Sequence, residues 1–353
     1  MTPYYLFFLI QISTLVLARF LNKKNSLGVL SFLILVGVLF AGLRGNIGTD
    51  TFMYRTMYSD VWAGRDTSNY EPGFRWLATI LGHVFGDNTQ IFIFSISAIQ
   101  GLVLLKVLQL LKERDVYYFI FTSTFYVNLQ FNQVRVGVAV LLINYALLLS
   151  LRRRQKLSGG GTAITALLTH VTVAPLAVLL ASRRPWIIVP IIIGTIVAIP
   201  FIAMKITGGA NAGGGINDDF RIGIGFVLTV ALLGGIIAAE PLQFRSRLTI
   251  VVLFGAYALF GLLSGKWLLA SRVAMIFEGG LYVLLLADKR SIRMRTVLFT
   301  IAVYHVYGSL SFIKNSDEAM RDLIAKYPGY AAGYEKTHWI PYEFYWNDDS
   351  GVK

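Results

Sequence analysis

LGVLSFLILVGVLFAGLRGNIGTD occupies residues 27–50 and decides the fold class, because an unbroken apolar run ends directly in an arginine, glycines and an aspartate. Apolar runs of similar length recur along the 353-residue chain, in which 56% of the residues are hydrophobic and 14% are charged. A run of about 20 apolar residues has the length of a helix that crosses a bilayer. We therefore expect an all-α, polytopic integral membrane protein with one transmembrane domain over residues 1–353.

About ten runs are long and apolar enough for transmembrane helices. They cover residues 3–20, 27–43, 89–111, 117–131, 134–151, 186–204, 222–239, 248–264, 268–287 and 296–313. The first run has no basic region before it and no small-residue cleavage site after it, so we interpret it as a retained helix and not as a signal peptide. By the positive-inside rule, the Lys and Arg clusters between the runs are cytoplasmic and both termini are outside.

One apolar stretch, residues 162–182, conflicts with that rule because basic clusters flank both of its ends. Each half holds roughly ten residues, or about 15 Å of helix, which reaches only half-way across the hydrocarbon core. We interpret the stretch as a re-entrant helical pair with His170 near its turn. Such a turn is tolerated only against protein or water. The alternative is an ordinary span that contains a packed, hydrogen-bonded histidine.

The composition argues against several classes of function. The net charge of +13 arises from short basic clusters between apolar runs, where membrane insertion explains them, so we predict no nucleic-acid partner. Without cysteine the chain has no disulfide, no thiolate metal site and no Cys nucleophile. The sequence contains no P-loop, no G-x-S-x-G elbow and no His-x-Glu ligand set, so we expect neither a metal nor a cofactor.

Three segments lie outside the membrane in this topology: residues 43–88, the glycine-rich loop 206–221 and the tail 314–353. The first is expected to form interfacial helices. The glycine-rich loop is typical of a mobile flap. The tail carries a cluster of Trp and Tyr, which favour the headgroup level and predict an interfacial anchor.

The first outer segment has the pattern of two helices. Thr49 or Asp50 can cap the first helix, in which Tyr54 and Tyr58 share a face. The second begins with Glu71 ahead of a proline and is expected to lie along the outer bilayer surface. An interfacial hairpin with ordinary ion pairs is the alternative interpretation.

Polar side chains crowd the junction of the fourth and fifth runs, where the chain reads NLQFNQVRVGVA from residue 128. An arginine costs roughly 2.5–3.5 kcal/mol at the centre of a membrane helix and less near the interface, so it usually faces a partner or a cavity. An anion is the natural partner of Arg135. Arg272 heads a later run, and we expect its side chain to reach the same cavity as Arg135.

Four pieces of sequence form a pattern between residues 42 and 175. They are Arg44-x-x-x-Gly48-x-Asp50-Thr51-x-x-Tyr54, then Glu71-x-Gly73-Phe74, then Asn132-x-x-Arg135-x-Gly137-x-Ala139, then His170 in an apolar helix. In order and spacing they resemble the EpsG-like branch of the Wzy-type polysaccharide polymerases, which make O-antigen, exopolysaccharide or capsule.

The resemblance implies a GT-C-like fold, in addition to the ten spans and the re-entrant pair that the apolar runs predict. It also implies a metal-independent glycosyltransferase in the bacterial cytoplasmic (inner) membrane, with its active site facing the exterior. The enzyme would join undecaprenyl-diphosphate-linked oligosaccharide repeats into a surface polysaccharide. Its partners would be that lipid-linked oligosaccharide, membrane lipid, a flippase and a chain-length regulator.

Roles for individual residues follow from the same resemblance. Arginine suits a diphosphate leaving group because its planar guanidinium is always charged, and a carboxylate or imidazole must take the proton of the acceptor hydroxyl. The candidate diphosphate-binding residues are Arg44, Arg135 and Arg272, with Arg44 assisting or ordering the first outer loop. The candidate bases, unranked, are Asp50, Glu71 and His170. The candidate glycan contacts are Tyr54, Trp76 and Asn132, with headgroup anchoring as the alternative for the two aromatic residues.

Two other functions stay open. An O-antigen ligase-like transferase would use the same diphosphate chemistry with a different acceptor. A flippase or exporter of lipid-linked glycan would also have polar residues and broken helices within its spans. The absence of an inverted repeat and the position of the unusual residues at the outer face argue against transport.

Overall fold

The computed structural model describes residues 2–19, 23–45, 51–65, 67, 70–151, 156–170, 173, 174, 176, 177, 224–240, 244–263, 268–287 and 291–326. All regular elements in this part of the chain are helices. They are α1 Thr2–Arg19, α2 Lys23–Gly42, α3 Thr51–Trp62, α4 Pro72–Phe85, α5 Thr89–Leu110, α6 Arg114–Ile120, the π-helix η1 Phe121–Asn132, α7 Val134–Leu151, α8 Lys156–Thr169, α11 Ile224–Ala239, α12 Phe244–Leu263, α13 Leu268–Leu286 and α14 Ile292–Lys326. For these residues the expected all-α fold is confirmed.

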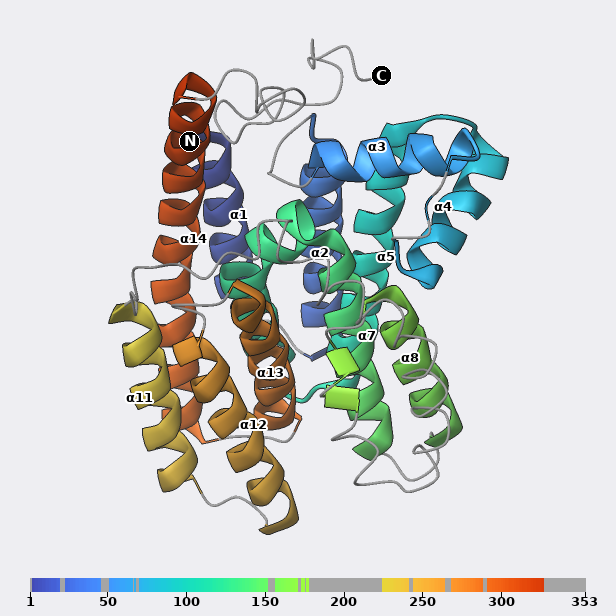
Figure 1. Cartoon of the computed structure of the whole chain (residues 1–353). Helices are drawn as coiled ribbons and strands as arrows, with labels where there is room; N and C mark the ends of the chain where they lie inside the picture. Colours follow the sequence, from blue (N-terminus) through green and yellow to red (C-terminus); the bar gives the residue numbers. More distant parts are fainter. Residues whose placement is uncertain are drawn as a thin grey trace.

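The long helices form a bundle, and the short helix α3 lies across one end of it (Figure 1). Helix α7 contacts α5, α8 and α13, which makes it a central element. Among the described residues, Thr89–Leu110, Val134–Leu151 and Ile292–Asn315 are long and apolar enough to cross a membrane, and five apolar helices are shorter, at 10–17 residues. The protein is therefore a membrane protein, while the count of about ten spans and the GT-C-like fold stay predictions.

Within the described residues, the predicted runs agree with the observed helices to within a few residues, except in two places. The fourth run, 117–131, is not one regular span: α6 gives way to the π-helix η1. The last helix, α14, continues to Lys326 and includes the start of the predicted tail. The sixth run, 186–204, the glycine-rich loop and most of the second half of the stretch 162–182 lie outside the described residues.

A separate apolar core attaches α3 and α4 to the bundle. The ring of Tyr58 on α3 stacks on Phe92 of α5, with centroids 4.8 Å apart, and Phe74 of α4 meets Phe92 edge-on at 5.3 Å. The Tyr58 hydroxyl also donates a hydrogen bond of 2.6 Å to Gly86 O. The predicted shared face of Tyr54 and Tyr58 is confirmed, because both side chains are buried. These contacts hold α3 and α4 against the first turns of α5 and α7.

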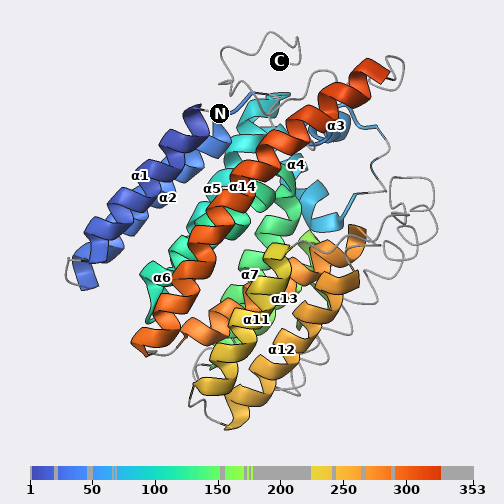
Figure 2. The ribbon, with the colours of Figure 1, turned by 90° about the vertical axis from the view of Figure 1, so that its left-hand side faces the viewer.

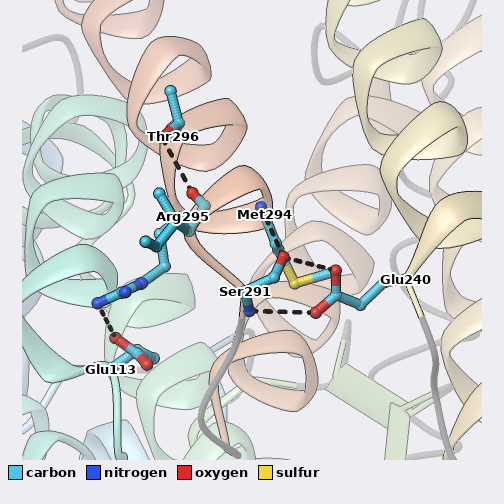
Figure 3. A network of polar contacts seen from close by, with 7 residues as sticks. Glu113, Glu240, Ser291, Met294, Arg295 and Thr296 are labelled. Carbon is cyan, nitrogen blue, oxygen red and sulfur yellow. Dashed lines mark hydrogen bonds and ion pairs between the residues drawn. The ribbon is translucent and has the colours of Figure 1, made fainter.

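Polar contacts join three helix ends at the other end of the bundle, opposite α3 (Figures 1 and 2). Figure 3 shows Glu240, which follows α11, accepting hydrogen bonds from Ser291 N and Oγ at 3.2 and 2.8 Å. Ser291 Oγ in turn accepts a bond of 3.1 Å from Met294 N and caps α14. Arg295 NH1 lies 3.6 Å from Glu113 Oε2, before α6. The network ties α11 and α6 to the start of α14.

Candidate functional site

Glu71 ends the loop before α4 and occupies the N-cap position, yet its side chain makes no capping hydrogen bond. Pro72 occupies the first position of α4, where the missing N–H costs the helix no hydrogen bond. The carboxylate turns into the protein instead. Its Oε2 accepts a hydrogen bond within an ion pair from Arg135 NH1, and its Oε1 lies 3.5 Å from His170 Nε2. We call Glu71, Arg135 and His170 the Glu71 cluster.

The Glu71 cluster is almost closed to solvent. The side chains of Glu71 and His170 are 3% and 2% exposed, and that of Arg135 is 13% exposed. A buried carboxylate is stable only when it is paired, and Arg135 supplies the opposite charge. The separation of His170 from Glu71 allows charge pairing but exceeds an ordinary hydrogen bond. The cluster can therefore hold a proton, or pass one between a carboxylate and an imidazole, beside a fixed positive charge.

His170 reaches Glu71 because α8 ends inside the bundle. The helix stops at Thr169, and His170 N closes its last turn with a hydrogen bond of 3.0 Å to Ala166 O. Figure 1 shows this end of α8 below α4. Gly73 in the first turn of α4 abuts it: a Cβ at Gly73 would lie 2.8 Å from Leu168 O, so only glycine permits this approach. The first turn of α4 thus packs against the end of α8. The end of α8 at Thr169 agrees with a turn near His170, and the re-entrant pair stays a prediction.

Arg135 lies in the first turn of α7 and is surrounded by aromatic rings. Its guanidinium carbon is 5.5 Å from the ring centre of Tyr54, 6.0 Å from that of Tyr70 and 5.6 Å from that of Phe74. Such cation–π contacts each contribute about 0.5–2 kcal/mol and hold the guanidinium in one place. Burial and the neighbouring charge of Asp60 raise the pKa of the Tyr70 hydroxyl, and Arg135 opposes that rise. Tyr70 therefore stays protonated at neutral pH.

Arg44 belongs to a different group of contacts. Its side chain is fully buried, Nε donates to Thr51 Oγ1 at 3.2 Å, and NH1 donates to Ala41 O. The Arg44 carbonyl accepts a bond of 3.4 Å from Arg55 NH2, which also donates to Gln90 Oε1 at 2.8 Å. These bonds fasten the end of α2 to the starts of α3 and α5. These contacts agree with the predicted role of Arg44 in ordering this segment, while the side of the membrane on which the segment lies and a contact of Arg44 with a diphosphate stay predictions.

The remaining predicted residues are not brought into the Glu71 cluster by the described contacts, apart from Tyr54. Tyr54, on α3, is 2% exposed, and its ring contacts the guanidinium of Arg135. Trp76 is 71% exposed and lies on the face of α4 opposite the buried Phe74. Arg272 lies in α13 and Asn132 ends η1, but their side chains lie outside the described part. Asp50 also lies outside it. For Tyr54, Trp76 and Asn132, contact with glycan stays a prediction.

The family model described as the EpsG family matches residues 27–328, which is most of the chain. The chain belongs to the EpsG family. Membership makes it a membrane protein of polysaccharide biosynthesis, with a polymerase of the glycosyltransferase type as its general class of activity. No curated protein and no solved structure matches the chain.

The EpsG-like pattern has structural reasons in this chain. Gly73 lets α4 approach α8, Phe74 supports the guanidinium, and Gly137 allows the close packing of α7 described below. Two contributors escaped the sequence reasoning. Tyr70 precedes Glu71 directly, and its position in the sequence was a usable signal. Gln100, a buried amide within an apolar run, was a second signal, because polar side chains are rare inside membrane helices.

Proposed function

We propose that the protein polymerises undecaprenyl-diphosphate-linked oligosaccharide repeats on the outer face of the cytoplasmic membrane. The growing glycan moves from its lipid diphosphate to the non-reducing end of the next lipid-linked unit. One observation carries the proposal: the Glu71 cluster joins, from three separate elements, a guanidinium, a carboxylate and an imidazole. These are the groups that a glycosyl transfer from a diphosphate requires.

The leaving group accounts for the arginine. As the bond between the anomeric carbon and the phosphate oxygen breaks, negative charge grows on the diphosphate. A fixed guanidinium stabilises that charge without giving up a proton and without a metal. The rings of Tyr54, Tyr70 and Phe74 keep Arg135 in position before the substrate arrives, so little reorganisation is needed during the reaction. Arg272 and Arg44 are the further candidates for diphosphate contact.

The acceptor accounts for the carboxylate and the imidazole. Its hydroxyl oxygen forms the new bond to the anomeric carbon and must lose its proton. Glu71 takes that proton in our proposal, and His170, 3.5 Å away, stabilises the carboxylate or relays the proton onward. Arg135 has a second effect, because it supplies the opposite charge that a buried carboxylate needs. Asp50 stays the alternative base.

The proposed reaction is tested by deleting the gene in its host strain and analysing the lipid-linked glycans. A polymerase predicts single lipid-linked repeats that accumulate facing outward. Single repeats facing inward would indicate a flippase instead. Finished polymers that remain on the lipid carrier would indicate a ligase. Either of the last two results would overturn the proposal.

The Arg135→Lys variant tests the residue on which the mechanism depends. Lysine keeps the positive charge and loses the planar fork, so we expect polymer formation in the complemented deletion strain to fall by about 10²-fold. Arg65→Lys is the matched control, because it makes the same chemical change at an arginine whose side chain is 70% exposed. Wild-type polymer length and yield from Arg135→Lys, at normal protein level, would remove Arg135 from the mechanism.

A further inference from the structure

The π-helix η1 and helix α7 meet at a break directly before the turn that carries Arg135. Gln133 is the non-helical residue at this break. Across it reaches Gln100, a fully buried side chain from the middle of α5. Gln100 Nε2 donates hydrogen bonds to Leu129 O at 3.1 Å and to Val134 O at 2.9 Å. One amide therefore holds a carbonyl on each side of the break, and Arg135 is the next residue along the chain.

Gly137 completes this joint. A Cβ at Gly137 would lie 2.6 Å from Leu129 O and would also collide with Gln100 Nε2, so a side chain has no room there. Gly137 N donates a bond of 2.9 Å to Gln133 O and closes the first turn of α7. The amide of Gln100, the end of η1 and the start of α7 are thus in direct contact, and none can move without the others.

The energetics indicate that Gln100 is present for its donor group and not for its packing. A buried amide costs free energy unless its polar atoms are hydrogen-bonded. Gln100 Oε1 is buried and has no hydrogen-bond partner among the described residues. An apolar side chain of similar size would avoid that cost, so filling space does not explain a glutamine here. The two hydrogen bonds donated by Nε2 explain it.

We propose that Gln100 is a positioning residue for Arg135, which it sets by holding the carbonyls on both sides of the break. The guanidinium of Arg135 must meet Glu71 and three aromatic rings that belong to other elements. A small rotation at the break would carry it away from all of them, and a misplacement of about 1 Å can cost about 10²-fold in rate. The expected effect of Gln100 on polymer formation rests on the proposed function. The claim that Gln100 positions Arg135 does not depend on it.

A double-mutant cycle between Gln100→Met and Arg135→Lys tests the proposal in the complemented deletion strain. Methionine keeps the side-chain length and removes both donated bonds. We expect Gln100→Met to lower polymer formation by about tenfold in the wild-type background, and by less than about twofold when Arg135→Lys is already present. Ser97→Ala is the matched control, because Ser97 is also buried and lies one turn earlier on α5. Among the described residues, its hydroxyl donates only to Ile93 O of the same helix. We expect it to change polymer formation by less than about twofold.

The thermal unfolding midpoints of the same four proteins in detergent give a second double-mutant cycle, and this measurement requires no activity. We expect the two substitutions to be non-additive there as well, because Gln100 acts through the placement of Arg135. Additive effects in both measurements would overturn the proposal and leave Gln100 as a structural residue. Should Arg135→Lys polymerise normally, the proposed function fails, and the thermal cycle alone decides the role of Gln100. If Gln100→Met does not accumulate, Gln100→Glu, which keeps the volume and loses the amide donors, takes its place.

Discussion

The Gly73→Ala substitution should move Glu71 away from His170 without replacing any charged residue. A Cβ at Gly73 would lie 2.8 Å from Leu168 O and 3.0 Å from Leu168 C, both of them backbone atoms of α8. Backbone atoms cannot rotate away as a side chain can. The two helices must move apart instead, at the point where Glu71 on one side faces His170 on the other.

The size of the shift follows from the contact distances. Ordinary contacts of a Cβ begin at 3.4 Å, so α4 must move away from Leu168 by about 0.6 Å, the difference from 2.8 Å. Added to the 3.5 Å between His170 Nε2 and Glu71 Oε1, this movement brings the pair to about 4 Å, at the limit of an ion pair. We expect polymer formation to fall by about 10-fold to 10²-fold. Overpacking should lower the free energy of unfolding by about 1–3 kcal/mol. The higher helix propensity of alanine should offset ~1 kcal/mol of that loss.

Gly161→Ala is the matched control, because it makes the same chemical change on α8 at an exposed position. An added Cβ there would meet no described atom within 4 Å beyond its chain neighbours and the backbone of its own helix. There we expect unchanged polymer and a gain in stability of up to ~1 kcal/mol. The assays are polymer length and yield in the complemented deletion strain, and the thermal midpoint of the purified protein in detergent. Normal polymer from Gly73→Ala at normal protein level would refute the argument that the approach of α4 to α8 builds the site.

Three further outcomes are expected. Glu71→Gln keeps the side-chain volume but removes the negative charge, and should lower polymer formation by about 10²-fold or more; unchanged polymer length would exclude Glu71 as the base. Burial, and then the charge of Asp87, raise the pKa of the Tyr58 hydroxyl. Its contribution to stability is therefore complete below about pH 10 and is lost as the pH rises through the folded-state pKa, so the difference in thermal midpoint between the wild type and Tyr58→Phe should shrink above that pH. A difference that grows would contradict this sign. Glu240→Ala removes the acceptor of both Ser291 bonds and should cost about 1–3 kcal/mol of stability with little change in polymer length, which a thermal melt and a polymer gel will check.

The sequence alone determined the class of protein and the position of most helices. Apolar runs of span length predict membrane helices wherever they occur, because the cost of placing polar side chains in hydrocarbon depends on local composition and not on distant contacts. The runs 89–111 and 134–151 became α5 and α7 nearly unchanged. The same reasoning predicted that α3 would bury Tyr54 and Tyr58, since helical periodicity places them on one face.

The tertiary structure alone decided which charged groups meet. Arg44 and Arg135 are equivalent in sequence terms, as arginines at the predicted outer ends of apolar runs. In the structure, one secures the ends of three helices and the other joins Glu71 across 64 residues. The π-helical form of η1 and the two carbonyls that Gln100 binds could not be predicted from the sequence either. Partners of this kind depend on where helices distant in sequence approach, and that is set by packing at single positions such as Gly73, where the absence of one methyl group lets α4 contact α8.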